Sequence, residues 1–311
     1  GMAFYGDKVV FSSYRNGNSK DFGWNNKPYL DLFSAEVNDK GLLTNVTPFP
    51  SEINTKTHES NATFSQDGRF MYFNRTNDKK VKIGNEKVAN IKIYRAEFIG
   101  SKWDNIIALP FCDDNYSAEH PVLSKDGKKL YFSSDMPGTL GSFDIFVVSV
   151  NEDGTYGTPV NLGNAINTTQ REQFPEISND GTILYFASDG HQGMGGLDIF
   201  MSKSYDGVFA KPLNLGQTIN SGMDDFGYVV DETKNKGYLS SNRKSSDNLY
   251  SFTRIENEER YLIEGEVKDK NTQSFLPGTQ VSLYDDNNIL IGQMVVGSDA
   301  QYVFNTEPNK K

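Results

Sequence analysis

The sequence has 311 residues, with 41 Asp and Glu against 31 Lys and Arg, which gives a formal net charge of −10 at pH 7. This excess of acidic side chains argues against nucleic-acid binding, which relies on Lys and Arg facing phosphates. A single cysteine, Cys112, excludes an internal disulfide framework, and no stretch approaches the roughly 18 consecutive apolar residues of a membrane helix, so direct membrane insertion is not expected.

A unit of short strands recurs along the chain. Each unit has an anchor residue in an apolar run, and the anchors are spaced by 62, 59, 54 and 53 residues: Phe11, Phe73, Phe132, Phe186 and Leu239. Before the three middle anchors, a first apolar run ends in an Asp-Gly turn at 64–69, 123–128 and 177–182. Asp-Gly between two apolar runs predicts a hairpin, because glycine accepts the positive φ of a tight turn.

Each anchor strand is followed by a variable loop and then by a third strand, predicted at 30–37, 91–98, 144–150, 198–204 and 248–254. A fourth strand, at 156–163 and 209–216, carries an aromatic residue and a proline. A linker with the pattern Ile-Asn closes the unit, at 53–54, 166–167 and 219–220. Four antiparallel strands per repeat are typical of a β-propeller. The chain is therefore predicted to be all-β, with a five-bladed propeller of four-stranded blades over residues 3–257.

Residues 261–311 predict a second, smaller β-domain. Apolar residues alternate there as in half-buried strands, and Pro277-Gly278 marks a turn: Val267, Val281, Leu283, Tyr302 and Phe304. We expect a partial β-sandwich with about half the usual number of strands, which would expose an edge.

A glycine-rich loop, "SDGHQGMGGLD" at 188–198, separates the second and third strands of the fourth repeat. A phosphate-binding loop needs a following helix whose amides face the anion, whereas a strand follows here. The loop is therefore predicted to be a hairpin connection, and its exposed tip offers candidate partner contacts at His191, Gly193 and Gly195.

An acidic residue precedes four of the first strands: Glu59, Glu119, Glu172 and Asp225. The first strands of propeller blades line the central channel, so these residues are predicted to form a ring near one mouth. Two interpretations remain open. Carboxylates that lie close together favour a bound cation, such as calcium, in the channel. Alternatively, each carboxylate caps backbone amides of its own interblade turn. No other cofactor is expected.

No nucleophile elbow, zinc-protease motif or phosphate loop occurs in the sequence, so the chain is predicted not to be an enzyme. The main enzymatic alternative is a five-bladed glycoside hydrolase, in which channel carboxylates perform acid/base chemistry. Such a site needs unequal acids on particular blades, whereas the predicted ring is repetitive. A glycan- or peptide-binding propeller is the other alternative.

The motifs "SxDGxxLYFxSD", "GHQGMGGLDIF" and "PVNLGNAIN" resemble the WD-repeat-like (TolB-type) propeller of OmpA-family envelope proteins from Bacteroidetes-type bacteria, which include PorE-like components of type IX secretion. The resemblance covers residues 3–255. Residues 263–304 are similar to the start of a carboxypeptidase-regulatory-like domain, although Ala300-Gln301 replaces the usual glycine before the final aromatic.

This resemblance implies a non-catalytic scaffold or protein-interaction module in the periplasm of a Gram-negative bacterium, associated with the outer membrane. Its implied partners are other envelope proteins. In the family, peptidoglycan is bound by an OmpA-like domain that has no counterpart in this sequence, so no peptidoglycan-binding residue is assigned. Gly1 ahead of Met2 is typical of a cloning remnant, so we expect any targeting signal to lie outside the sequence given.

Overall fold

In the computed structural model, which describes residues 1–15, 28–255 and 261–306, the regular elements are all β-strands. The chain divides into two compact units, Gly1–Arg254 and Ile255–Lys311. The predicted domain boundary at residue 257 lies outside the described residues. Within the described part of the chain, no helix has the length and apolar character needed to cross a membrane.

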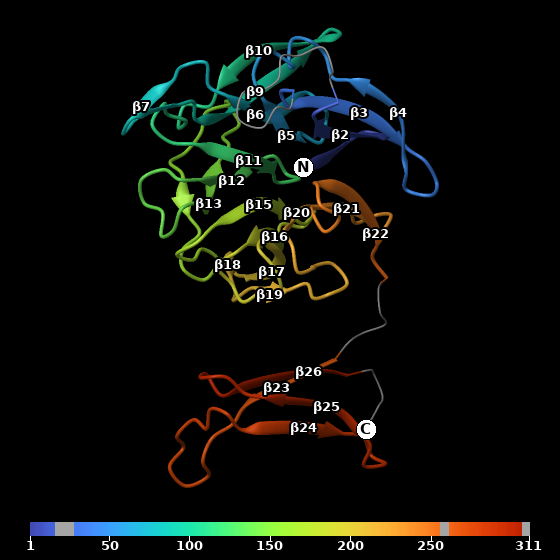
Figure 1. Ribbon diagram of the computed structural model, residues 1–311, viewed down its shortest axis with the longest axis vertical. Coiled ribbons are helices and arrows are strands. Elements are labelled where there is room, and N and C mark those ends of the chain that lie inside the picture. Colours follow the sequence, from blue (N-terminus) through green and yellow to red (C-terminus); the bar gives the residue numbers. More distant parts are fainter. Residues whose placement is uncertain (16–27, 256–260, 307–311) are drawn as a thin grey trace. The chain divides into compact units, whose positions relative to one another are not determined.

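The described strands of the first unit form a five-bladed β-propeller (Figure 1). Blade 1 contains β1 (Met2–Tyr5), β2 (Lys8–Ser13), β3 (Asp31–Val37) and β4 (Leu43–Pro48). Blade 2 contains β5 (Glu59–Phe64), β6 (Phe70–Thr76), β9 (Ile91–Ile99) and β10 (Lys102–Ala108). Blade 3 contains β11 (Ala118–Leu123), β12 (Lys129–Ser134), β13 (Asp144–Ser149) and β14 (Val160–Asn161). Blade 4 contains β15 (Glu172–Ile177), β16 (Ile183–Ser188), β17 (Asp198–Tyr205), β18 (Val208–Phe209) and β19 (Leu213–Asn214). Blade 5 contains β20 (Asp225–Asp231), β21 (Lys236–Ser241) and β22 (Asn248–Thr253).

The hairpin turns follow from their Asp-Gly sequences. Gly68, Gly127 and Gly181 have φ values of 69°, 71° and 73°, which only glycine adopts readily. In blade 2, the Ser65 amide donates a hydrogen bond to the Phe70 carbonyl oxygen across the turn, at 2.9 Å. Blade 2 also carries an additional hairpin, β7 (Val81–Ile83) and β8 (Glu86–Val88), within its loop between the second and third strands.

The fourth strands of blades 3 and 4 are shorter than predicted. Only Val160–Asn161 pairs with β13 in blade 3, and the partners of β17 are split into β18 and β19. Pro159 and Pro212 lie within the predicted strands, and a proline has no N–H to contribute to the ladder. The proline therefore explains the interruption.

The prediction of four strands in every blade is wrong for blade 5. Among the described residues, its sheet has three strands, in the order β20–β21–β22. In blades 3 and 4, an aromatic residue from the fourth-strand region contacts the preceding blade. The Tyr156 hydroxyl donates a hydrogen bond to the Tyr72 hydroxyl at 3.3 Å, and the Phe209 ring packs edge-on against Tyr131. In blade 5, Tyr228 of the first strand reaches Tyr185 of blade 4, with ring centroids 4.7 Å apart, and Phe252 of the third strand stacks on Tyr228 at 4.8 Å.

The space for Phe252 comes from the residue opposite. A Cβ on Gly237 would lie 2.3 Å from the Phe252 ring, so only glycine fits there. Phe252 thus packs, from the third strand, on the Tyr228 ring that contacts blade 4.

The ring closes between blades 1 and 5. Strand β1 contacts β20, and one hydrophobic core joins Met2, Val9 and Phe11 of blade 1 to Val229 and Tyr238 of blade 5. The Tyr238 hydroxyl also donates to the Gly41 carbonyl oxygen at 2.9 Å. Closure of this kind removes the open edges that a linear array would leave at its ends.

The Ile-Asn linkers hold each third strand in place. In the linker after blade 3, the Asn167 side chain accepts a hydrogen bond from the Ile145 amide at 2.8 Å and donates to the Ile145 carbonyl oxygen at 3.0 Å. Asn54 and Asn220 form the same pair of bonds with the third strands of blades 1 and 4. Each asparagine side chain therefore substitutes for one residue of an additional strand.

The second unit consists, in its described residues, of two two-stranded sheets. Strand β23 (Tyr261–Glu266) pairs with β26 (Gln301–Thr306), and β24 (Gln280–Tyr284) pairs with β25 (Leu290–Val295). Phe304 is buried, and its ring lies so close to Gly292 that a Cβ there would be 3.0 Å from it. This contact brings the two sheets together.

Candidate functional site

Three of the four predicted acids occupy one repeated position at the start of an inner strand: Glu59, Glu172 and Asp225, each 0% exposed. Each accepts hydrogen bonds from the backbone amide and the hydroxyl of the residue four positions earlier. For Glu172 these donors belong to Thr168, at 2.8 and 2.7 Å. Thr55 and Ser221 serve Glu59 and Asp225 in the same way.

Further donors complete these three sites. Arg75 Nε lies 3.0 Å from Glu59, Arg243 contacts Asp225, and the Ser188 hydroxyl donates to Glu172 at 2.7 Å. Burial raises the pKa values of Glu59 and Glu172, and the hydrogen bonds oppose this shift. These carboxylates therefore fasten each interblade linker to the strand that follows it.

Glu119 does not belong to this set. In blade 3 the repeated position is occupied by Ala118, which pairs with Ser134 as Glu172 pairs with Ser188. Because successive strand residues face opposite sides, a shift of one residue turns Glu119 away from the linker. Its carboxylate instead accepts a hydrogen bond from Gln173 Nε2 at 2.7 Å and lies 3.7 Å from His120 Nδ1.

The predicted four-carboxylate cation site is thus not assembled. Within residues 1–15, 28–255 and 261–306, no group of three or more Asp, Glu, His or Cys side chains is placed so that it could hold a metal ion. The physical reason is that three of the acids already receive their hydrogen bonds from linker and neighbouring groups, and the fourth lies on the other face of its strand.

A narrow neck in the central channel is formed by four equivalent residues of the inner strands: Asn61, His120, Phe174 and Gly227. Each lies at a register shift in its strand and has a positive φ, between 42° and 61°. For His120 and Phe174 this conformation carries a cost of about 1 kcal/mol or more. Such strain concentrates at functional sites in proteins, which directs attention to this neck.

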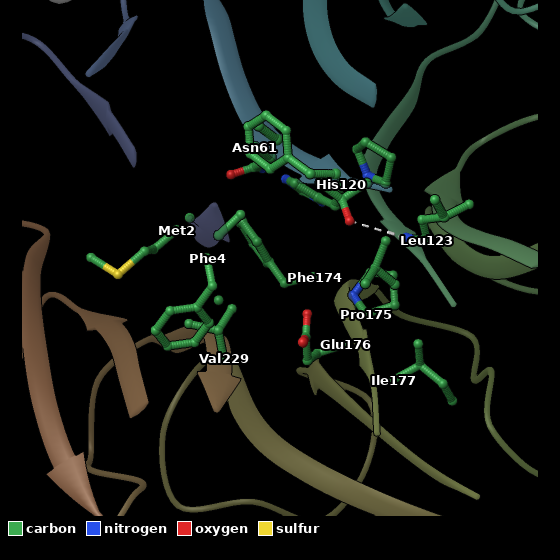
Figure 2. A pocket seen from close by; sticks show the side chains of 18 of the residues that line it. Met2, Phe4, Asn61, His120, Leu123, Phe174, Pro175, Glu176, Ile177 and Val229 are labelled. Carbon is green, nitrogen blue, oxygen red and sulfur yellow. Dashed lines mark hydrogen bonds between the residues drawn. The ribbon is translucent and has the colours of Figure 1, made fainter. Parts of the chain in front are cut away.

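The His120 and Phe174 rings are stacked with centroids 3.7 Å apart, and Phe174 continues to Phe226 at 4.8 Å. Cavities of about 230 and 440 Å³ adjoin the neck, and both are lined by Asn61, His120 and Phe174. Figure 2 shows the His120 and Phe174 side chains beside the first of these cavities, with Glu176 below them.

Sequence reasoning missed Glu176, which lines the smaller cavity. Burial, together with the nearby Glu232 carboxylate, raises its pKa from 4.5 to about 8. Burial also raises the pKa of Glu119 to about 7 and holds the pKa of His120 well below its usual value. The equivalent residues in blades 2, 3 and 5 are uncharged, namely Thr63, Val122 and Val229. The signal available in the sequence was an acidic residue at a position that is uncharged in these other blades.

The glycine loop is a hairpin connection between β16 and β17. His191 is not at an exposed tip: its Nε2 lies 2.7 Å from the Ile166 carbonyl oxygen, and its ring packs against Phe186 and Phe200. The Asp198 carboxylate accepts hydrogen bonds from the amides of Met194 and Gly195, at 2.7 and 2.9 Å. His191 is therefore corrected from a contact candidate to a packing residue.

Gly193 and Gly195 are in close contact with neighbouring atoms. A Cβ on Gly193 would lie 2.1 Å from the Asp198 carboxylate, and one on Gly195 would lie 2.2 Å from the Met223 carbonyl oxygen. The loop therefore packs directly on the linker that leads into blade 5. The loop is nevertheless exposed to solvent at Gly193, Met194 and Gly195, and Met194 is its large apolar exposed side chain.

Replacing Gly195 with alanine is expected to lower the free energy of unfolding by about 1 to 3 kcal/mol, because the added methyl group meets backbone atoms that must move. Urea denaturation monitored by tryptophan fluorescence measures this loss. Gly222→Ala is the matched control, since a Cβ there meets no atom within 4 Å. Equal stability of the two variants would contradict the close packing of the loop.

No family model matches the chain, and no curated protein matches it. Among solved structures, the chain is similar to TolB from Acinetobacter baumannii, with 15% identity, 77% of this chain covered and a TM-score of 0.42. It spans 50% of that TolB chain. A glycosyl hydrolase from Bacteroides ovatus gives 13% identity, coverage of 81% and 82%, and a TM-score of 0.46. An α-L-arabinofuranosidase from Lactobacillus brevis gives 13% identity, coverage of 95% and 94%, and a TM-score of 0.47.

Proposed function

We propose that the chain is a non-catalytic, protein-contacting module of a cell-envelope assembly in a Gram-negative bacterium. In this proposal the propeller lies in the periplasm, associated with the outer membrane, and contacts other envelope proteins. The second unit is the beginning of a carboxypeptidase-regulatory-like β-sandwich, and peptidoglycan is bound by a separate OmpA-like domain. The motifs that resemble OmpA-family and PorE-like propellers support this assignment.

A row of exposed apolar loop tips carries the proposal. Leu140 and Met194 occupy equivalent places in the loops of blades 3 and 4, and Met223 lies in the linker on which the second loop rests. Their exposed fractions are 51%, 49% and 47%. Apolar side chains gathered on loops held by a rigid scaffold are typical of protein-interaction surfaces. We call these three residues the loop-tip row.

Site-specific photo-crosslinking in the native host tests this contact. A photoreactive phenylalanine analogue at Met194 is expected to give a discrete crosslinked product in the periplasmic or outer-membrane fraction. The same analogue at Lys102, an exposed residue of β10 in blade 2, is the control. Products of equal yield at both positions, or a cytoplasmic location of the chain, would contradict the proposal.

One observation favours a second candidate function, the hydrolysis of a glycan in the channel. Glu119 and Glu176 are acids on particular blades rather than members of a repeated set, as a pair of carboxylates with different roles requires. Release of the chromophore from a panel of nitrophenyl glycosides, abolished by Glu176→Gln, would establish this function in place of the first. Without turnover, the scaffold proposal stands.

A further inference from the structure

The channel neck contains buried polar atoms without a partner. Two such atoms belong to residues that line both cavities, Asn61 Oδ1 and His120 Nδ1, and neither has a hydrogen bond to any described residue. Two further unpaired atoms, Asn74 Nδ2 and Ser133 Oγ, lie on the neighbouring strands β6 and β12, outside the lining of the cavities. The His120 side chain is only 10% exposed, and Asn74 is buried. A buried polar group left unpaired costs about 1 to 3 kcal/mol, so an unpaired group of this kind indicates a site for a ligand or an ordered water.

The two atoms that face the cavities suit a ligand that can both donate and accept hydrogen bonds. Asn61 Oδ1 is an acceptor. Nδ1 of the neutral His120 imidazole is an acceptor or a donor, depending on the tautomer. Hydroxyl groups match such a mixed set, because each has one donor and two acceptor positions.

The charge state of the neck favours an uncharged ligand. Burial lowers the pKa of His120 and raises that of Glu176 to about 8, so both side chains are largely neutral at pH 7. Glu119, with a pKa raised to about 7, is partly ionised there. The other charged residues that line the cavities, Lys125 and Asp247, are exposed to solvent. A charged ligand at the neck would therefore lose its hydration without a full, buried opposite charge in return.

The walls of both cavities also include apolar and aromatic side chains. Phe174 and Phe226 line the larger cavity, and Phe4, Phe64 and Tyr228 line the smaller one. Small-molecule sites combine such apolar walls with a few convergent polar groups, in cavities of a few hundred Å³. The C–H faces of a sugar ring suit these walls, and its hydroxyl groups suit the unpaired polar atoms.

We propose that the channel neck is a binding site for a neutral, hydroxyl-rich ligand of monosaccharide size. The residues that contact it are Asn61, His120 and Glu176, beside the Phe174 ring. This site is separate from the loop-tip row and requires no bond cleavage. It can therefore be correct whether or not the proposed protein contact is.

Isothermal titration of the full chain at pH 7 tests the proposal with two neutral probes, D-glucose and N-acetyl-D-glucosamine, and two charged relatives, D-glucosamine and D-glucuronate. At least one neutral probe is expected to bind with a Kd of about 1 mM or lower, and at least about tenfold more tightly than either charged relative. His120→Phe, which keeps an aromatic ring but removes Nδ1, is expected to weaken binding about tenfold. Glu152→Gln, an exposed carboxylate in the turn after β13, leaves binding unchanged.

Proton NMR of the unaltered chain provides a second readout that does not depend on the folding of a variant. The sequence contains three histidines, so their ring resonances can be followed individually. The neutral probe is expected to shift the His120 resonance and to leave that of His191 in place. Absence of binding at about 20 mM, which would leave only ordered water in the neck, overturns the proposal. Tighter binding of a charged relative, or binding that His120→Phe does not weaken, overturns it as well.

Discussion

Replacing Asn167 with alanine is expected to lower the free energy of unfolding by about 1 to 4 kcal/mol. The Asn167 side chain occupies both backbone groups of Ile145, which is 0% exposed, and also bonds to Asn161. Alanine leaves the Ile145 N–H buried without a partner, which costs about 1 to 3 kcal/mol. The Ile145 carbonyl oxygen loses one of its two hydrogen bonds and keeps the one from the Leu162 amide at 3.1 Å. Urea denaturation, followed by the fluorescence of the buried Trp103, measures the change.

Asn85→Ala is the matched control, because Asn85 is exposed in the turn between β7 and β8. It is expected to change stability by no more than about 0.5 kcal/mol. Asn167→Asp keeps an acceptor for the Ile145 amide but loses the donor to its carbonyl oxygen. A loss below about 1 kcal/mol for Asn167→Ala would show that the linker asparagines do not hold the third strands.

The repeat could be predicted from the sequence because its signals are local. Asp-Gly turns, aromatic anchor strands and Ile-Asn linkers each specify a nearby backbone conformation, and their order predicts the order of strands within a blade. The three-stranded form of blade 5 could not be predicted in this way. Nor could the packing of Phe252 against Gly237, because these residues are 15 positions apart and become neighbours only when β21 and β22 pair.

The candidate site was harder to predict, because its chemistry depends on register. Counting six residues back from the turn serines Ser65 and Ser178 reaches Glu59 and Glu172, whereas the same count from Ser124 reaches Ala118. Glu119 was therefore grouped with acids that face the opposite side of their strands. The burial that shifts the pKa of Glu176 depends on residues from several blades, and no local pattern records it.

The contrast between repeated and unrepeated acids separates architecture from function in this propeller. Acids that recur at one position, such as Glu59 and Glu172, are enclosed by linker and neighbouring donors and have little capacity left for a ligand. Glu119 and Glu176 interrupt the repeat, and both line the cavities at the neck. The repeated acids stabilise the connection between blades, whereas the unrepeated acids are the ones available to a ligand in the channel.

Replacing Glu176 with glutamine is expected to stabilise the chain at alkaline pH and to make its stability less dependent on pH. The pKa of Glu176 is about 8 in the folded chain and close to 4.5 when the chain is unfolded. Between these values the folded state holds a proton that the unfolded state has lost, so the free energy of unfolding falls as the pH rises. The penalty is absent below about pH 4.5 and complete above about pH 8.

A shift of this size corresponds to a penalty of about 2 to 4 kcal/mol at pH 9, after allowance for partial exposure of Glu176 to water. Glu176→Gln removes the ionisable group and keeps the size of the side chain. Urea denaturation at pH 5, 7 and 9 measures the difference between this variant and the unaltered chain, which should be small at pH 5 and should increase with pH. Glu152→Gln is the control, because its carboxylate is exposed outside the channel and should give no such increase. A constant difference between the Glu176 variant and the unaltered chain from pH 5 to pH 9 would show that the Glu176 carboxyl is as well hydrated in the folded channel as in the unfolded chain.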